Sequence, residues 1–362
     1  MTYIIGLTLT CFLILLLFLK KEKQKADFLL LGWLAILVVH IFLSYVQYTE
    51  IAYKYPHTLG LGFSLPLLHG LFIYVYASEL TGSSILKNKT IFFHLLPFIF
   101  LTILAIPFYS LPASKKIAVF QHQGQGFEWY TTTQLILISI SGLAYSVATL
   151  LKIKKYRIKL LHHFSNTEKK KLEWVEYSAI GLGVIWIVAV FFNDPIIFVA
   201  VTIFVLLIGV FGINQTTVFS SEITIAPVAE SEKPTEIVPE QQKYIRTGLG
   251  NEEAEKLMID LDALMQTKKP FTNSELTLKD LAGMLQCSPN HLSQIINTKY
   301  GNTFYHYINS LRLKEFIEQA SFPENKKFTF LAIAYDCGFN SKTTFNKYFK
   351  LETGKTPTEY FE

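Results

Sequence analysis

The chain has 362 residues and a formal net charge of +5 at pH 7. That charge is unevenly distributed: the residues up to Ile213 include 17 basic and 9 acidic side chains, whereas those from Asn251 onward include 13 basic and 14 acidic ones. The three cysteines, Cys11, Cys287 and Cys337, are too scattered to indicate a disulfide framework or a metal cluster.

Seven apolar runs occupy the first 213 residues, and each is long enough to cross a hydrocarbon core about 30 Å thick. They are Thr2 to Leu19, Phe28 to Val46, Leu59 to Ala77, Ile91 to Tyr109, Thr131 to Leu151, Trp174 to Phe192 and Pro195 to Ile213. The first run lacks the basic region and the cleavage site of a secretory signal, so we interpret it as a retained span. The sequence predicts an all-α fold that begins with a seven-helix transmembrane bundle over residues 1–213.

The Lys and Arg residues of the connecting loops predict the orientation of the bundle, because cytoplasmic loops carry an excess of them. One set of alternate loops contains 14 such residues and the other contains 3. This asymmetry places the N-terminus outside and everything past Ile213 in the cytoplasm. We therefore expect a multi-pass protein of a bacterial inner membrane, with the lipid bilayer as a partner and its C-terminal domain beside the DNA.

Two histidines, His40 in the second run and His69 in the third, are the deepest ionisable residues of the predicted spans. Each can satisfy a polar group of a neighbouring helix in a packed bundle. The alternative is a ligand or proton site that senses an unknown small-molecule or envelope signal. The pattern does not indicate a metal site.

Ser165 and Glu168, after the fifth run, have the spacing of a capping box. This pattern predicts a helix that begins at Asn166 and continues through Trp174 into the sixth span. Such a rod could carry a membrane rearrangement into the cytoplasm, although capping is equally consistent with simple anchoring.

Residues 214–250 are predicted to form a cytoplasmic linker, because Pro227, Pro234 and Pro239 lie among glutamates in a segment too polar to build a core. If flexible, it would have a typical end-to-end distance of about 35 Å. Residues 251–269 then predict an amphipathic connecting helix with a single apolar stripe. This stripe can pack on the domain that follows, or it can form the seam of a homodimer.

Residues 270–362 contain the pattern of a helix-turn-helix twice. In the first copy an apolar helix face ends at Leu285, and Ser288 with Pro289 begins a second helix within three residues. This second helix leaves an uncharged polar face outward, as a recognition helix does in the major groove. The outward residues are Asn290, His291, Ser293, Gln294 and Asn297.

The second copy follows some fifty residues later. Phe330, Ile333 and Ala334 repeat the buried face, Gly338 suits the left-handed residue that ends a helix, and Ser341 caps the next helix. Its outward residues offer donors for bases and cations for phosphates, and they are Lys342, Thr343, Asn346, Lys347 and Lys350.

Between the copies, Asn302 can cap a helix from Thr303 to about Gln319, which would be about 25 Å long. A rigid spacer of this length could set two recognition helices about one DNA turn of 34 Å apart. Two units on one chain could then read successive major grooves of double-stranded promoter DNA.

The C-terminal region resembles the AraC/XylS family of transcription regulators. The resemblance rests on Ile333 to Ser341 and Thr356 to Tyr360 around the second copy, and on His291 to Ser293 and Arg312 around the first. It implies an AraC-type DNA-binding domain over residues 270–362, RNA polymerase as a partner, and base or phosphate contacts by a defined set of residues. These are Asn290, Ser293 and Gln294 in the first copy, and Asn340, Lys342, Thr343, Asn346 and Lys347 in the second. Phe361 stands where the family commonly has an arginine.

Upstream, Leu95 to Phe98 and Phe164 to Glu168 resemble a bacterial group that joins seven spans to this domain. No phosphate-binding glycine loop, HExxH motif or nucleophile and base pair is present in the soluble part, so we expect neither an enzyme nor a cofactor. The sequence predicts a membrane-anchored, one-component transcription regulator. The alternative is a seven-span receptor or transporter-like protein whose near-neutral helical tail is a protein-interaction module.

Overall fold

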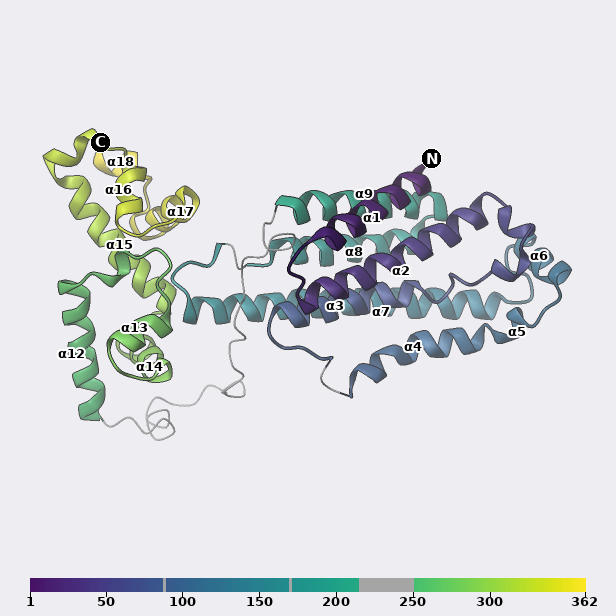
Figure 1. Cartoon of the computed structure of the whole chain (residues 1–362), viewed down its shortest axis with the longest axis horizontal. Coiled ribbons are helices and arrows are strands. Elements are labelled where there is room, and N and C mark those ends of the chain that lie inside the picture. Colours follow the sequence, from purple (N-terminus) through teal and green to yellow (C-terminus); the bar gives the residue numbers. More distant parts are fainter. Residues whose placement is uncertain (87–88, 169–170, 215–250) are drawn as a thin grey trace. The chain divides into compact units, whose positions relative to one another are not determined.

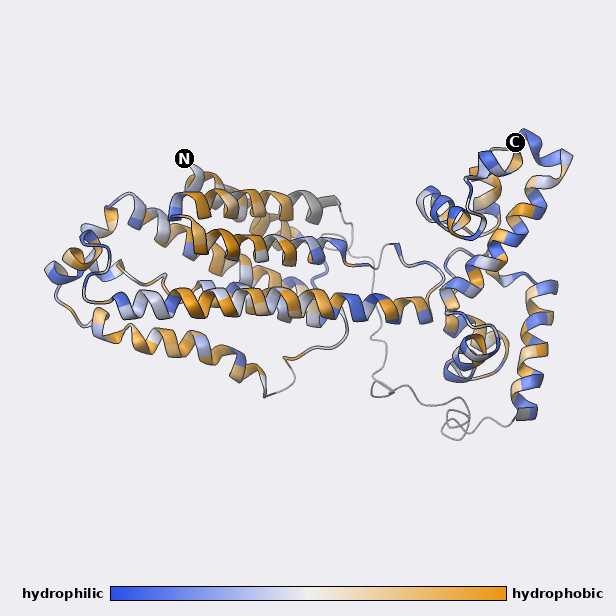
Figure 2. Cartoon of the chain, turned by 180° about the vertical axis from the view of Figure 1, so that it is seen from behind, coloured by the Kyte–Doolittle hydropathy of each residue, from blue (hydrophilic) through white to orange (hydrophobic). Residues whose placement is uncertain are grey.

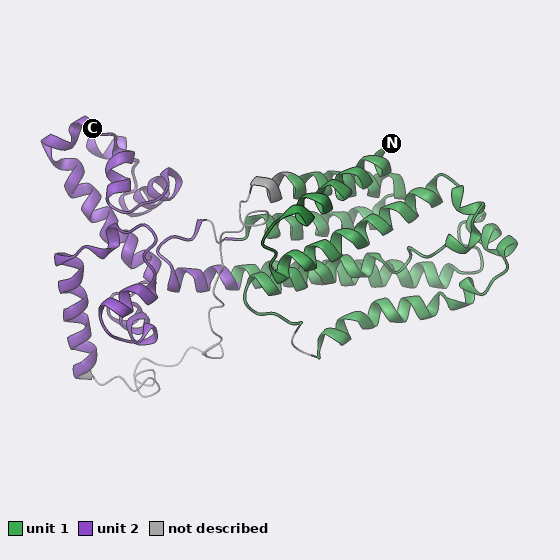
Figure 3. Ribbon diagram, in the orientation of Figure 1, with its two compact units in different colours: residues 1–154, 172–230 green, residues 155–171, 231–362 purple. Residues whose placement is uncertain are grey.

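The computed structural model describes residues 1–86, 89–168, 171–214 and 251–362. Apart from an isolated bridge between Phe164 and Thr277, the regular structure of these residues is helical. The chain divides into two compact units, shown in Figure 3. Unit 1 is made of residues 1–154 and 172–230, and unit 2 of residues 155–171 and 231–362. The predicted linker at 214–250 lies outside the described residues except for Asn214, which is the last residue of a helix.

Unit 1 contains the apolar helices, which run alongside one another in Figure 1 and are predominantly hydrophobic in Figure 2. In this unit α1 packs against α2 and α9, α2 packs against α3, and α8 packs against α9. The longer helices are α1 (Thr2–Leu19), α2 (Lys25–Tyr48), α3 (Pro66–Leu80), α4 (Ile91–Leu104), α7 (Glu128–His163), α8 (Glu173–Phe191) and α9 (Asp194–Asn214), and the last residues of α7, from 155 onward, belong to unit 2. Between α4 and α7 lie two shorter helices, α5 (Ile106–Tyr109) and α6 (Ala113–Gln121).

Four of these helices, α1, α2, α7 and α8, are long and apolar enough to cross a membrane. Helix α4 and residues Asp194–Gly209 of α9 are apolar over shorter stretches. The third predicted run forms a helix only from Pro66, because Gly60 has a left-handed backbone (φ +84°) and Pro66 suits a first helical position. Several apolar helices are therefore present, and the number of seven spans stays a prediction.

The outer surface of unit 1 is suited to lipid. Large apolar side chains such as Phe18, Phe92, Phe93 and Ile140 are more than half exposed. A soluble protein rarely leaves so many large apolar groups in water, because each would lose the free energy of burial. Contact with lipid would remove that cost.

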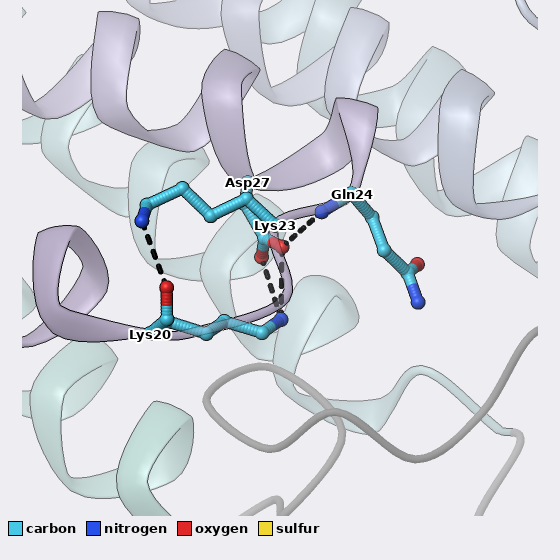
Figure 4. Close-up of polar contacts among 4 residues, drawn as sticks. All are labelled: Lys20, Lys23, Gln24 and Asp27. Atoms are coloured by element: carbon cyan, nitrogen blue, oxygen red, sulfur yellow. Dashed lines mark hydrogen bonds and ion pairs between the residues drawn. The ribbon is translucent and has the colours of Figure 1, made fainter.

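The turn between α1 and α2 is held by a buried ion pair. The Lys20 ammonium lies 2.8 Å from Oδ2 and 3.0 Å from Oδ1 of Asp27, and both side chains are under 5 % exposed (Figure 4). The backbone N–H of Gln24 also donates to Asp27, and the Lys23 ammonium donates to the carbonyl of Lys20. Because removing one partner would leave a buried charge, the pair holds the two helices together.

The prediction of a rod from Asn166 into the sixth span is wrong. Helix α8 begins at Glu173, and Leu172 before it has a left-handed backbone (φ +52°). Residues 164–167 form no helix, and the polar groups of Ser165 and Glu168 contact residues more than a hundred positions away. A capping box pattern reflects only local spacing. Here the side chains of Ser165 and Glu168 form hydrogen bonds with distant residues instead.

Unit 2 contains the amphipathic helices of the C-terminal region. They are α12 (Asn251–Thr267), α13 (Leu278–Met284), α14 (Pro289–Lys299), α15 (Phe304–Ser321), α16 (Phe330–Asp336), α17 (Lys342–Thr353) and α18 (Pro357–Phe361). In the described part of this unit, 3-10 turns also lie at Pro270–Thr272 and Pro323–Lys327.

The stripe of α12 packs inside its own unit. Ala254 and Leu257 pack with Ile295 of α14, and Leu261 and Met265 enter the core with Leu281. The interpretation of α12 as a packing helix is therefore confirmed, and its stripe is not free to form a dimer seam.

Candidate nucleic-acid interface

The first helix-turn-helix is formed by α13 and α14. Thr277 caps α13 and exchanges hydrogen bonds with Asp280, and the Ser288 hydroxyl accepts from the backbone N–H of His291 at 3.1 Å to cap α14. Gln286 has a positive φ in the turn. Leu292, Ile295 and Ile296 bury one face of α14.

The second helix-turn-helix, α16 and α17, repeats this construction. Ser341 caps α17, as the sequence predicted, by accepting from the N–H of Thr344 at 3.1 Å. Phe345, Tyr348 and Phe349 bury one face of α17. Gly354 ends the helix with a left-handed backbone.

Helix α15 joins the two motifs because it belongs to both cores. Its first turns, with Phe304 and Ile308, pack with α12, α13 and α14, whereas Leu313 and Phe316 pack with α16 and α17. Its N-cap is Thr303, one residue later than predicted. With 18 residues the helix is about 27 Å long, so it fixes the spacing of the two motifs.

A buried arginine in the middle of α15 ties the two halves together. Arg312 is 2 % exposed, and its guanidinium donates to the backbone carbonyls of Phe271 and Asn273, both at 2.7 Å. It also donates to Asn309 Oδ1 at 3.2 Å and to Ser165 Oγ at 3.1 Å. Burial lowers the pKa of Arg312 to about 10, so the group stays charged at neutral pH.

Gly338 allows the second motif to approach this arginine. Its φ is +96°, and a Cβ there would lie 2.4 Å from the carbonyl oxygen of Phe271 and 2.9 Å from Arg312 Nε. Only glycine fits a left-handed position with backbone this close.

Most of the residues predicted to contact DNA lie at the surface of unit 2. Asn290, Lys342, Thr343, Lys347 and Lys350 are exposed. Ser293, Asn340 and Asn346 are half-buried, and the Ser293 hydroxyl lies 3.3 Å from Asn297 Nδ2. The three lysines give α17 a positive face, whereas the outward face of α14 is polar and uncharged.

Gln294 is placed differently. Both polar atoms of its amide are buried, and neither has a hydrogen-bond partner among the described residues. Its side chain would have to rotate before it could read a base. Periodicity places a residue on a helix face but does not determine its rotamer, so the sequence could not show this.

Sequence reasoning missed what holds the two motifs together. Arg312 stands four residues from both Ile308 and Phe316, so it lies on the buried face of an amphipathic helix. A charge on such a face needs buried hydrogen-bond partners, so the sequence alone could have predicted that Arg312 is paired. It could not have predicted which residues are its partners, Ser165 above all.

A second candidate site lies inside unit 1, where the two predicted sensing histidines meet. His40 Nδ1 and His69 Nε2 are 2.9 Å apart, and the Trp33 indole N–H donates to His69 Nδ1 at 3.2 Å. Because indole is only a donor, His69 carries its proton on Nε2 and donates to His40. The pair borders a cavity of about 370 Å³, which is mostly apolar and also has Gln134, Asp194 and Trp186 in its wall.

The comparisons agree with the two motifs. Residues 281–362 match a helix-turn-helix domain family of the AraC type, which supports a DNA-binding regulator of that kind. No curated protein and no solved structure matches the chain. The match begins inside α13 at Leu281, so it covers the end of that helix, the turn and α14 of the first motif, and all of the second motif.

The contact at Gly338 leads to a test of the junction. We expect Gly338→Ala to lower the local stability of α15 to α17 by about 2 kcal/mol or more, from backbone strain and overpacking together. Hydrogen exchange of these helices in the detergent-solubilised chain measures this. Gly354→Ala is the matched control, because it has a left-handed φ but open space around its Cβ. Equal losses in the two variants would refute a close-packed junction.

Proposed function

We propose that this protein is a membrane-anchored transcription regulator that reads promoter DNA through both helix-turn-helix motifs. The observation that carries the proposal is the pair of capped motifs built on one rigid helix, α15, in a unit that matches the AraC-type family over residues 281–362. The apolar helices of unit 1 anchor it in the inner membrane, with the C-terminal domain in the cytoplasm.

In this proposal α14 and α17 enter successive major grooves. Asn290, Ser293 and Asn346 offer amide and hydroxyl groups to base edges, whereas Lys347 and Lys350 neutralise phosphates. Helix α15 supports this role because a spacer about 27 Å long approaches the 34 Å of one DNA turn. RNA polymerase is the expected partner at the promoter. A homodimer would need a surface other than the stripe of α12.

A set of single substitutions tests direct readout. Asn290→Ala and Asn346→Ala should change preference at bases in different halves of one site, and each lost contact should cost about 1–3 kcal/mol. Lys350→Ala should weaken binding to all sequences alike. The measurement is binding of the full-length protein in detergent to a randomised DNA library.

Lys326→Ala is the control, because Lys326 is exposed in the turn after α15, outside both motifs. The alternative function, a protein-interaction module, predicts no sequence preference in any variant or in the unmodified chain at any salt concentration.

The proposal includes a signal sensed in unit 1, at the cavity beside His40 and His69. A mostly apolar cavity with a few convergent polar groups is the usual form of a small-molecule site. The wall also includes Trp186, whose indole nitrogen packs against Gly142 outside the cavity. These features favour a small, mostly apolar ligand. Such a ligand acts by binding two conformations of the bundle unequally.

Replacing a cavity histidine tests this sensing role. His69→Gln should change transcript levels from a bound promoter several-fold, because it breaks the chain of hydrogen bonds from Trp33 to His40. His57→Gln, an exposed histidine outside the cavity, should leave them unchanged. If the spans are exchanged for an unrelated anchor of the same topology and regulation persists, unit 1 is only a tether.

A further inference from the structure

The segment from Phe164 to Glu168, which directly follows α7, is bound to the helix-turn-helix domain within unit 2. Phe164 pairs with Thr277 as an isolated bridge. The Ser165 backbone N–H donates to the carbonyl of Leu276 at 3.3 Å, and its hydroxyl donates to the same oxygen at 2.6 Å. Asn166 donates to Glu275 Oε1 at 2.7 Å. We call residues 164–168 the docking segment.

The docking segment occupies a built site rather than an open surface. Ser165 is 1 % exposed, and Asn166 and Thr167 are also buried. The Ser165 carbonyl accepts from Asn309 at 3.3 Å and from Arg312 at 3.5 Å, and its hydroxyl accepts from Arg312. The same arginine that joins the two motifs therefore holds the segment.

The last residue of the segment lies at the start of α17. The Glu168 carboxylate accepts from the hydroxyl of Ser341 at 2.6 Å and from that of Thr344. Ser341 is the N-cap of α17, and Thr344 lies in its first turn. The N-terminus of a helix attracts anions, because its first N–H groups are unpaired and the helix dipole is positive there.

We propose that Glu168 takes the place of a DNA phosphate at α17 and holds the protein in a state of low DNA affinity. This inference rests on the function proposed above. A carboxylate with two hydroxyl donors at a helix N-terminus has the charge and acceptors that a backbone phosphate would bring. DNA and the docking segment then compete for the same hydroxyls, and a phosphate approaching α17 is also repelled by the carboxylate.

The segment connects this competition to the membrane helices. Helix α7 begins at Glu128 in unit 1 and ends at His163 in unit 2, and Phe164 follows it directly. A movement of the inner end of α7 therefore pulls on the segment. The ligand proposed for the cavity in unit 1 could release Glu168 without contacting DNA. It needs only to bind more tightly to the bundle conformation in which α7 has moved.

Glu168→Gln removes the charge and keeps the shape, so it is the direct test. For the full-length protein in detergent, we expect this variant to bind its selected DNA sequence at least about fivefold more tightly. The slope of log K against log salt should steepen by about one phosphate contact. Unchanged or weaker binding would overturn the proposal.

Glu173→Gln is the matched control. Glu173 is exposed and lies five residues further along the chain, so its substitution removes the same charge without touching the docking segment. We expect its affinity to equal that of the unmodified chain. If both variants bind equally more tightly, general charge explains the gain and the proposal is wrong. If the unmodified chain and all variants lack sequence preference, the proposed function itself fails.

Hydrogen exchange supplies a second readout on the unmodified protein. Competition is reciprocal, so bound DNA must weaken docking by the factor by which docking weakens DNA binding. The Ser165 amide, which donates to Leu276, should exchange faster when the selected DNA is present. Equal or slower exchange at this amide would contradict the inference.

Discussion

The buried guanidinium of Arg312 is the interaction on which the arrangement of unit 2 depends. Its donors reach the backbone at Phe271 and Asn273, the side chain of Asn309 and the docking segment at Ser165. A buried charge is costly unless its hydrogen bonds are satisfied, and here carbonyl, amide and hydroxyl oxygens satisfy them. An apolar side chain could fill the same volume. It could not fix the directions of several backbone segments at once.

Much of this architecture was predictable because it follows from local patterns. The apolar stripes of α13 to α17, the caps at Ser288 and Ser341, and the left-handed turn at Gly338 are properties of a few neighbouring residues. The errors lie where distant parts meet. The spacing of Ser165 and Glu168 fits a capping box, yet their partners lie across the domain. The third apolar run does not form a helix over its full length, because a turn at Gly60 precedes Pro66.

The net charge of the chain conceals where its charged residues lie in the two units. The C-terminal domain is near neutral, so phosphate binding depends on where its cations lie, and three lysines of α17 lie at the surface. One acidic residue, Glu168, is held at the start of that helix. In unit 1, Lys20 counts toward the predicted orientation but is paired with Asp27. Without Lys20 the excess of basic residues in those loops remains large.

The central claim is that the intact protein reads DNA while anchored in the membrane. Genome-wide mapping of the DNA cross-linked to the full-length protein in cells tests it most directly. The account predicts discrete sites that share one motif with two halves about one helical turn apart, recovered with the membrane fraction and lost when Asn290 and Asn346 are both replaced by alanine. The account would be contradicted by a map without enriched sites, or by sites that survive the double replacement unchanged.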